Sequence, residues 1–232
     1  MRLAQRAVLL GVRCSARSEI NGARAQRSSS PLHRECYARR SMTAARSIRN
    51  SADVEAMRER APTGMRSEII HGALLMAPAP RASHQFAIGR LLAALDRALP
   101  LRRGGSRPTG WLFLLGPELH LGEGPDKLNP DIAAWRAERA PSLDDYPIEV
   151  VPDWLCEVLS PSTEVYDRAT KLPLFAAYGA RHAWLLDPDA RTLEVFALDS
   201  AGARQIARLD GDDIVCAAPL DEVPIELATL WG

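Results

Sequence analysis

Apolar residues follow two different spacings in the part of the chain that begins near residue 67. Between residues 84 and 99 they recur three and four positions apart, which predicts an amphipathic helix that ends at Pro100. A second helix is expected over residues 169–178, stopped by Gly179. Short apolar or alternating runs predict strands at residues 111–115, 118–121, 131–135, 154–159, 183–187, 192–198 and 213–216.

The stretch EIIHGALLMAPAP, which starts at Glu68, holds two β-rich runs around His71 and Gly72 and predicts an N-terminal β-hairpin. The polar residues 122–127 predict a turn, and the proline- and aspartate-rich residues 141–152 predict a loop. Strands interleaved with helices are typical of an α/β fold, here a mixed central β-sheet flanked by helices. We expect one such domain over residues 51–232.

Residues 1–50 show neither spacing, and they contain 11 arginines against only two acidic residues. Such a composition cannot bury enough apolar surface to offset the entropy of ordering, so a disordered Arg-rich extension is expected. Three interpretations stay open: an organellar transit peptide, a nucleic-acid-binding tail, or a start codon assigned too far upstream, with Met42 and Met57 as later starts.

The net charge of zero, from 29 basic and 29 acidic residues, hides an asymmetry between these two parts. Residues 51–232 carry 18 of the basic and 27 of the acidic residues. A protein that grips many phosphates usually presents a basic surface, because Lys and Arg supply most of the non-specific affinity for DNA. The charge balance therefore argues against tight DNA binding by the domain alone.

Apolar runs long enough to cross a bilayer, roughly 18 to 20 residues, are absent from the sequence. The run AVLLGV near the start is too short and has arginine-rich surroundings. We therefore expect a cytoplasmic protein with no membrane partner.

Glu157 stands inside the almost wholly apolar run WLCEVL, which is typical of a central strand buried on both faces. Burying an ionised carboxylate there is costly unless it is paired or binds a metal. Asp131, at the start of another strand, is a natural second carboxylate, and two such groups suit a hard cation, Mg²⁺ or Mn²⁺. Lys171, one of only two lysines in the chain, follows in the next helix, where its ammonium can stabilise the charge of a reacting phosphate. These residue types suit metal-dependent phosphodiester hydrolysis.

Five motifs in this order, NPDIAAW, EVLSPST, DRATKL, FAAYGA and HAWLLDP, resemble the bacterial Uma-type family of restriction endonucleases, which belongs to the PD-(D/E)XK nuclease superfamily. The resemblance covers about residues 57–209 and is most specific over residues 130–188. It implies a restriction-endonuclease-like core and a Mg²⁺-dependent endonuclease that cleaves DNA. A homodimer would suit that activity, since double-strand cleavage is commonly built from two symmetric active sites.

The resemblance also implies roles for particular residues. Asp131 and Glu157 match the two acidic metal ligands, and Glu68 matches an acidic residue of the opening hairpin that serves as an auxiliary ligand through water. The superfamily's lysine usually stands two residues after the second acid, where this chain has Leu159; the family places it on the following helix, which makes Lys171 the catalytic lysine. His84 matches a histidine at the start of the first helix, where we expect it to cap or pack.

Each candidate also has a structural interpretation. Asp131 can cap the turn after Pro130, and Glu68 can be a solvated strand carboxylate. Glu157 can form a buried ion pair with Arg168 or Lys171 that needs no metal. The corresponding rival function is a catalytically inactive nuclease-fold protein that serves in binding or assembly.

Overall fold

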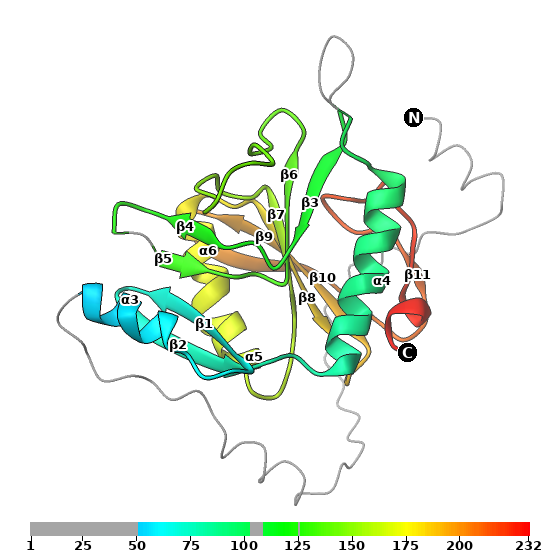
Figure 1. Ribbon diagram of the computed structural model, residues 1–232. Helices are drawn as coiled ribbons and strands as arrows, with labels where there is room; N and C mark the ends of the chain where they lie inside the picture. The colour runs from blue at the N-terminus through cyan, green and yellow to red at the C-terminus, as the bar shows by residue number, and fades with distance from the viewer. Residues whose placement is uncertain (1–50, 103–108, 125) are drawn as a thin grey trace, which may run out of the picture.

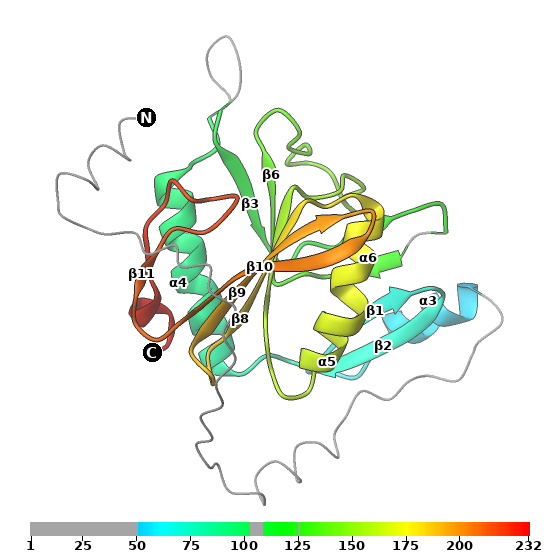
Figure 2. The ribbon, with the colours of Figure 1, turned by 180° about the vertical axis from the view of Figure 1, so that it is seen from behind.

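The computed structural model of this chain describes residues 51–102, 109–124 and 126–232, so the extension expected over residues 1–50 lies outside the described residues. A six-stranded β-sheet forms the centre, with helix α4 (Ala82–Ala98) on one face and helix α6 (Leu172–Tyr178) on the other (Figures 1 and 2). The predicted α/β class, with a mixed central sheet flanked by helices, is confirmed. None of the helices in the described ranges combines the length and the apolar character needed to span a membrane.

The central sheet has the strand order β10-β9-β8-β7-β6-β3. Its strands are β3 (Trp111–Leu115), β6 (Ile132–Arg136), β7 (Trp154–Val158), β8 (His182–Asp187), β9 (Thr192–Asp199) and β10 (Gly202–Asp210). Only β7 and β8 pair in parallel, because the helical segment between them carries the chain back across the sheet. The edge strand β10 was not predicted from the sequence.

A smaller antiparallel sheet lies beside the centre and contains the predicted hairpin. Its order is β2 (Ala73–Pro78), β1 (Met65–Ile70), β5 (Asp126–Leu128) and β4 (Leu119–Leu121). The hairpin turns at His71 and Gly72, whose φ angles of 51° and 73° are both positive, as a tight turn requires. The turn expected over residues 122–127 is shorter than predicted, because β5 begins at Asp126. Helix α3 (Ser51–Glu59) packs on this hairpin.

The helical segment between β7 and β8 begins before residue 169, where the sequence predicted its start. It consists of α5 (Glu164–Tyr166), a π-helical turn η1 (Asp167–Lys171) and α6. The N–H of Leu172 donates to the carbonyl of Asp167, and Pro173 then falls in the first turn of α6, where its missing N–H is tolerated. Gly179, with φ 95°, ends the helix as predicted.

The predicted strand at residues 213–216 exists, but it does not extend the central sheet. β11 (Ile214–Val215) pairs with β12 (Ile225–Glu226) in a separate two-stranded sheet. The 3₁₀ turn η2 (Leu227–Leu230) follows and contacts α4. This C-terminal segment therefore lies over the α4 face of the molecule (Figure 1).

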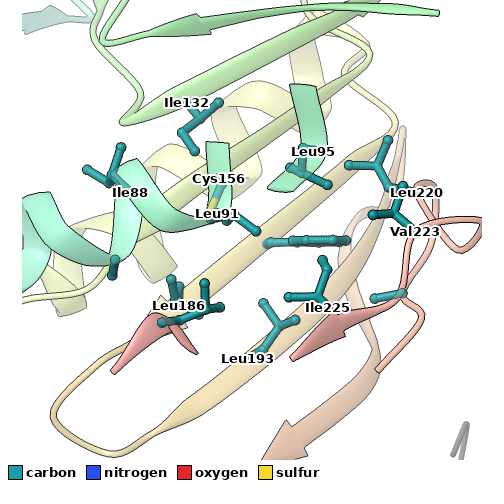
Figure 3. Packing of buried hydrophobic residues seen from close by; sticks show 14 of the residues in the cluster. Ile88, Leu91, Leu95, Ile132, Cys156, Leu186, Leu193, Leu220, Val223 and Ile225 are labelled. Atoms are coloured by element: carbon teal, nitrogen blue, oxygen red, sulfur yellow. The ribbon is translucent and has the colours of Figure 1, made fainter. Parts of the chain in front are cut away.

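Two apolar cores fill the two faces of the central sheet. On the α4 face, helix residues at i, i+3 and i+7 pack against side chains of the sheet and of the C-terminal segment (Figure 3): Ile88, Leu91, Leu95, Ile132, Cys156, Leu186, Leu193, Leu220, Val223 and Ile225. On the opposite face, Leu155 and Leu185 pack with Phe175 of α6 and with Leu128 of the smaller sheet. Since side chains alternate along a strand, Glu157 shares this second face with Leu155.

Candidate active site

The two predicted acidic ligands, Asp131 and Glu157, lie side by side at one end of the central sheet. β6 and β7 are antiparallel with Ile132 opposite Cys156, so the next position outward places Asp131 beside Glu157. The N–H of Val158 donates to Asp131 Oδ2 at 2.8 Å, and the N–H of Asp131 donates to Glu157 Oε2 at 3.3 Å. Each acid is only 3% exposed. Sheet register thus fixes both carboxylates in place.

Lys171 reaches the same point from the π-helical turn. Its Nζ lies 2.6 Å from Glu157 Oε1 and 3.0 Å from Glu68 Oε1, and the residue is 3% exposed. Of the two partners that the sequence suggested for Glu157, Lys171 is the one in contact, while Arg168 binds Glu194 instead. The three principal candidates are therefore brought together.

Glu68 joins the site from strand β1. The backbone N–H of Asn129 donates to its Oε1 at 2.7 Å, and the hydroxyl of Tyr166 donates to its Oε2 at 3.2 Å. With the Lys171 contact, these bonds make Glu68 a partly buried and fully bonded carboxylate, with a side chain 12% exposed, and not the solvated one of the alternative interpretation.

Three further residues belong to the site. His84, near the start of α4, places Nε2 at 3.0 Å from Asp131 Oδ2, so it contacts a candidate ligand beyond the capping or packing role expected for it. Arg66, two positions before Glu68 on the same face of β1, places Nη1 at 2.7 Å from Asp131 Oδ1. Asp167, 4% exposed, lines the same cavity as these groups.

Sequence reasoning missed Arg66 and Asp167. The DRATK motif did contain a signal for Asp167, because residues four apart on a helical segment lie close together, here Asp167 and Lys171. No comparable signal pointed to Arg66, whose partner is distant along the chain.

The cavity opens between the smaller sheet and the turn that follows β7. Residues 75–80 of β2 and its exit line one side of the cavity. Ser160, Ser162 and Thr163 line it as well, and the Ser160 hydroxyl lies 3.0 Å from each of the other two hydroxyls. The carboxylates therefore meet a concave space bordered by small hydroxyl groups.

The electrostatics of the cavity reflect a surplus of negative charge. Burial raises the pKa of Glu157 well above its usual range, and the charges of Asp167, Asp131 and Glu68 add to this effect while Lys171 opposes it. For Asp131, burial is outweighed by the His84 hydrogen bond and the Arg66 charge, which lower its pKa to about 2. Burial opposes the charge of Lys171, but the surrounding carboxylates raise its pKa well above the ordinary value.

A hard divalent cation fits this donor set in chemistry and charge. Four carboxylates, Glu68, Asp131, Glu157 and Asp167, line the cavity, and two cations, Arg66 and Lys171, contact them. Carboxylate oxygens are the ligands that Mg²⁺ and Mn²⁺ prefer. In the described part of the chain, no three His, Cys, Asp or Glu side chains stand together in an arrangement that could hold a metal ion. Arg66 and Lys171 instead contact the acidic oxygens of Asp131 and Glu157.

Comparisons with known proteins agree with this architecture. A family model described as "Uma2: Putative restriction endonuclease" matches residues 52–226. Among solved structures, the chain is similar to a "putative nuclease belonging to DUF820" from Anabaena variabilis ATCC 29413, with a TM-score of 0.59 and 20% identity over 77% of this chain and 96% of that chain. At this identity the likeness shows a shared fold. Curated proteins give no match.

Proposed function

The chain belongs to the Uma2 family, described as putative restriction endonucleases, and we propose that it is a Mg²⁺-dependent DNA endonuclease with a site of the PD-(D/E)XK type. The observation that carries the proposal is the cavity in which Glu68, Asp131, Glu157 and Asp167 outnumber the cations that contact them. A structural ion pair needs no such excess of acids, whereas a divalent cation would offset it.

The proposed roles follow from the contacts of each group. Asp131 and Glu157 would hold the cation, and Glu68 would assist through water. When bound, Mg²⁺ or Mn²⁺ polarises the phosphoryl oxygen and lowers the pKa of water. Lys171 lies within 3.0 Å of both Glu157 and Glu68. Its ammonium orients the attacking water and stabilises the negative charge that develops on the phosphate.

The substrate, in this proposal, is DNA cut by a homodimer whose two sites act on the two strands. The acidic composition of residues 51–232 means that affinity for DNA depends on the few basic groups at the cavity and on the metal.

The test combines Mn²⁺ binding by calorimetry with cleavage of supercoiled plasmid by the full chain. We expect wild-type protein to bind Mn²⁺, and both Asp131→Asn and Glu157→Gln to abolish binding and slow cleavage by about 100-fold or more. Glu194→Gln is the matched control, because Glu194 is an equally buried glutamate outside the cavity. That variant should keep wild-type Mn²⁺ affinity. Full cleavage by Glu157→Gln would sink the assignment.

A second candidate function is a catalytically inactive nuclease-fold protein that serves in binding or assembly. The contacts of Arg66 with Asp131 and of Lys171 with Glu157 favour it, since they pair each principal acid with a cation of the chain itself. Under this alternative, calorimetry detects no Mn²⁺ binding by wild-type protein, even with DNA present.

A further inference from the structure

Arg66 is the arginine that enters the carboxylate cluster. A second arginine lines the cavity, Arg81, but its Nη2 bonds to Asp189 at 3.1 Å at the protein surface. Arg66 and Glu68 lie on the face of β1 that also carries Ile70, a residue of the core beneath α6. The strand that contributes the auxiliary acid therefore also directs a guanidinium at Asp131.

The contact occupies one particular oxygen of Asp131. Oδ2 already accepts from the Val158 N–H at 2.8 Å and lies 3.0 Å from His84 Nε2, whereas Oδ1 is contacted by Arg66 Nη1 at 2.7 Å. A metal ion bound through Oδ1 would therefore meet the guanidinium at the same oxygen. Two cations in that position repel each other strongly in a buried site.

Arg66 is also the more exposed of the two cations that contact the cluster. Its side chain is 36% exposed, against 4% for Lys171, which is held between two carboxylates. A guanidinium has five N–H donors, and only Nη1 bonds to Asp131. Its planar donors also match the oxygens of a phosphate.

We propose that Arg66 and the divalent cation exclude each other at Asp131, and that the displaced guanidinium binds a non-bridging oxygen of the DNA phosphate at the cavity mouth. The proposal rests on the proposed function and assigns Arg66 two successive roles. Without metal it neutralises Asp131, and with metal it supplies a positive charge to the substrate. In a domain as acidic as this one, such an arginine contributes strongly to DNA affinity.

The first arm of the experiment measures Mn²⁺ affinity of the full chain by calorimetry. Arg66→Gln removes the competing charge, so we expect Mn²⁺ to bind about 10-fold more tightly than to wild type, since a nearby like charge typically costs on this scale. Arg81→Gln is the matched control, because it removes an arginine from the same cavity wall without touching Asp131, and it should stay within about 2-fold of wild type. Thermal melting checks that both variants fold.

The second arm measures binding of a short DNA duplex in Ca²⁺, an oxygen-preferring dication used in place of Mg²⁺. Arg66→Gln should lose about 10-fold or more in DNA affinity, and the slope of log affinity against log salt should fall by about 1. Arg66→Lys should recover part of the DNA affinity, because lysine keeps the positive charge. The recovery should be incomplete, because lysine lacks the planar set of donors.

The outcomes separate this inference from the proposed function. If wild type binds Mn²⁺ and Arg66→Gln binds it equally or more weakly, the exclusion is overturned while the metal site stands. If only Arg66→Gln binds Mn²⁺, the exclusion is supported; if neither binds, both proposals fail. Wild-type DNA affinity in Arg66→Gln, or no DNA binding by wild type, overturns the phosphate role.

Discussion

Two buried glutamates lie in one row across the central sheet, and cations from one helical segment reach both. Glu157 on β7 and Glu194 on β9 are both cross-strand neighbours of Leu185, and each is 3% exposed. Lys171 Nζ lies 2.6 Å from Glu157 Oε1, and Arg168 Nη2 lies 3.2 Å from Glu194 Oε1. The two glutamates therefore match in burial, in their position beside Leu185, and in having a cation from the same helical segment as partner.

They differ in how charge is balanced around each acid. Glu194 faces two arginines, Arg168 and Arg208, and it does not line the cavity. Glu157 shares a single lysine with Glu68 and also has Asp131 and Asp167 nearby. Burial of a carboxylate therefore does not by itself indicate a metal ligand. An excess of acids over cations at an open cavity is the feature that distinguishes the Glu157 site.

The largest expected effect that tests this difference comes from removing the helical cation at each site. Lys171→Met leaves Glu157 and Glu68 without their shared partner and should lower the free energy of unfolding by roughly 3 kcal/mol in metal-free buffer. Arg168→Met leaves Glu194 with Arg208 and should cost about 1 kcal/mol, because both arginines are partly solvated. Urea denaturation measures both values.

Titration with Mn²⁺ distinguishes the two variants further. Because a dication can replace the lost ammonium, Lys171→Met should recover stability on titration with Mn²⁺ by more than wild type gains. Arg168→Met should gain no more than wild type does. Equal losses in the two variants, or no recovery of Lys171→Met, would contradict the distinction between the sites.

The candidate site was largely predictable because its main acids lie on strands with strong local patterns. The run WLCEVL placed a charge where both strand faces are buried, and Asp131 began a second buried strand. Lys171 followed on the next helical segment. These three positions depend on strand burial and order along the chain, which sequence periodicity reports directly.

The rest of the site depends on contacts between elements that are distant in sequence. Arg66 meets Asp131 only because the hairpin packs against the end of the central sheet, and an arginine on an alternating strand otherwise indicates a solvated position. The π-helical turn was also not predicted, since the hydrogen bond from the Leu172 N–H to the Asp167 carbonyl does not change the spacing of apolar residues. Strand β10 was missed because its edge position leaves it largely exposed, without a clear alternation.

A smaller effect is expected from Asp167, whose pKa burial raises to about 6 while Lys171 opposes the shift. This folded-state pKa exceeds the ordinary aspartate value of 3.8, so the protonated acid favours the folded state. That contribution is fully present below about pH 4 and is lost as the pH rises through about 6. Asp167→Asn mimics the protonated acid, so in EDTA it should raise the melting temperature by several degrees at pH 7 and by less at pH 4.5. The same difference at both pH values would contradict this assignment.

The smallest expected change in stability comes from Glu164, an exposed residue that pairs with Arg168 beside the Glu194 site. Glu164 Oε1 accepts from Arg168 Nε at 3.2 Å in an i,i+4 pair, and the Glu164 side chain is 46% exposed. Because water screens such a pair, Glu164→Gln should change the free energy of unfolding by less than about 0.5 kcal/mol, with Mn²⁺ affinity and cleavage unaffected. A loss as large as that of Arg168→Met in urea denaturation would mean that Glu164, and not buried Glu194, holds Arg168 in place. The ion pair of Arg168 with Glu194 would then contribute less to stability than its burial suggests, and the comparison with the Glu157 site would lose its balanced member.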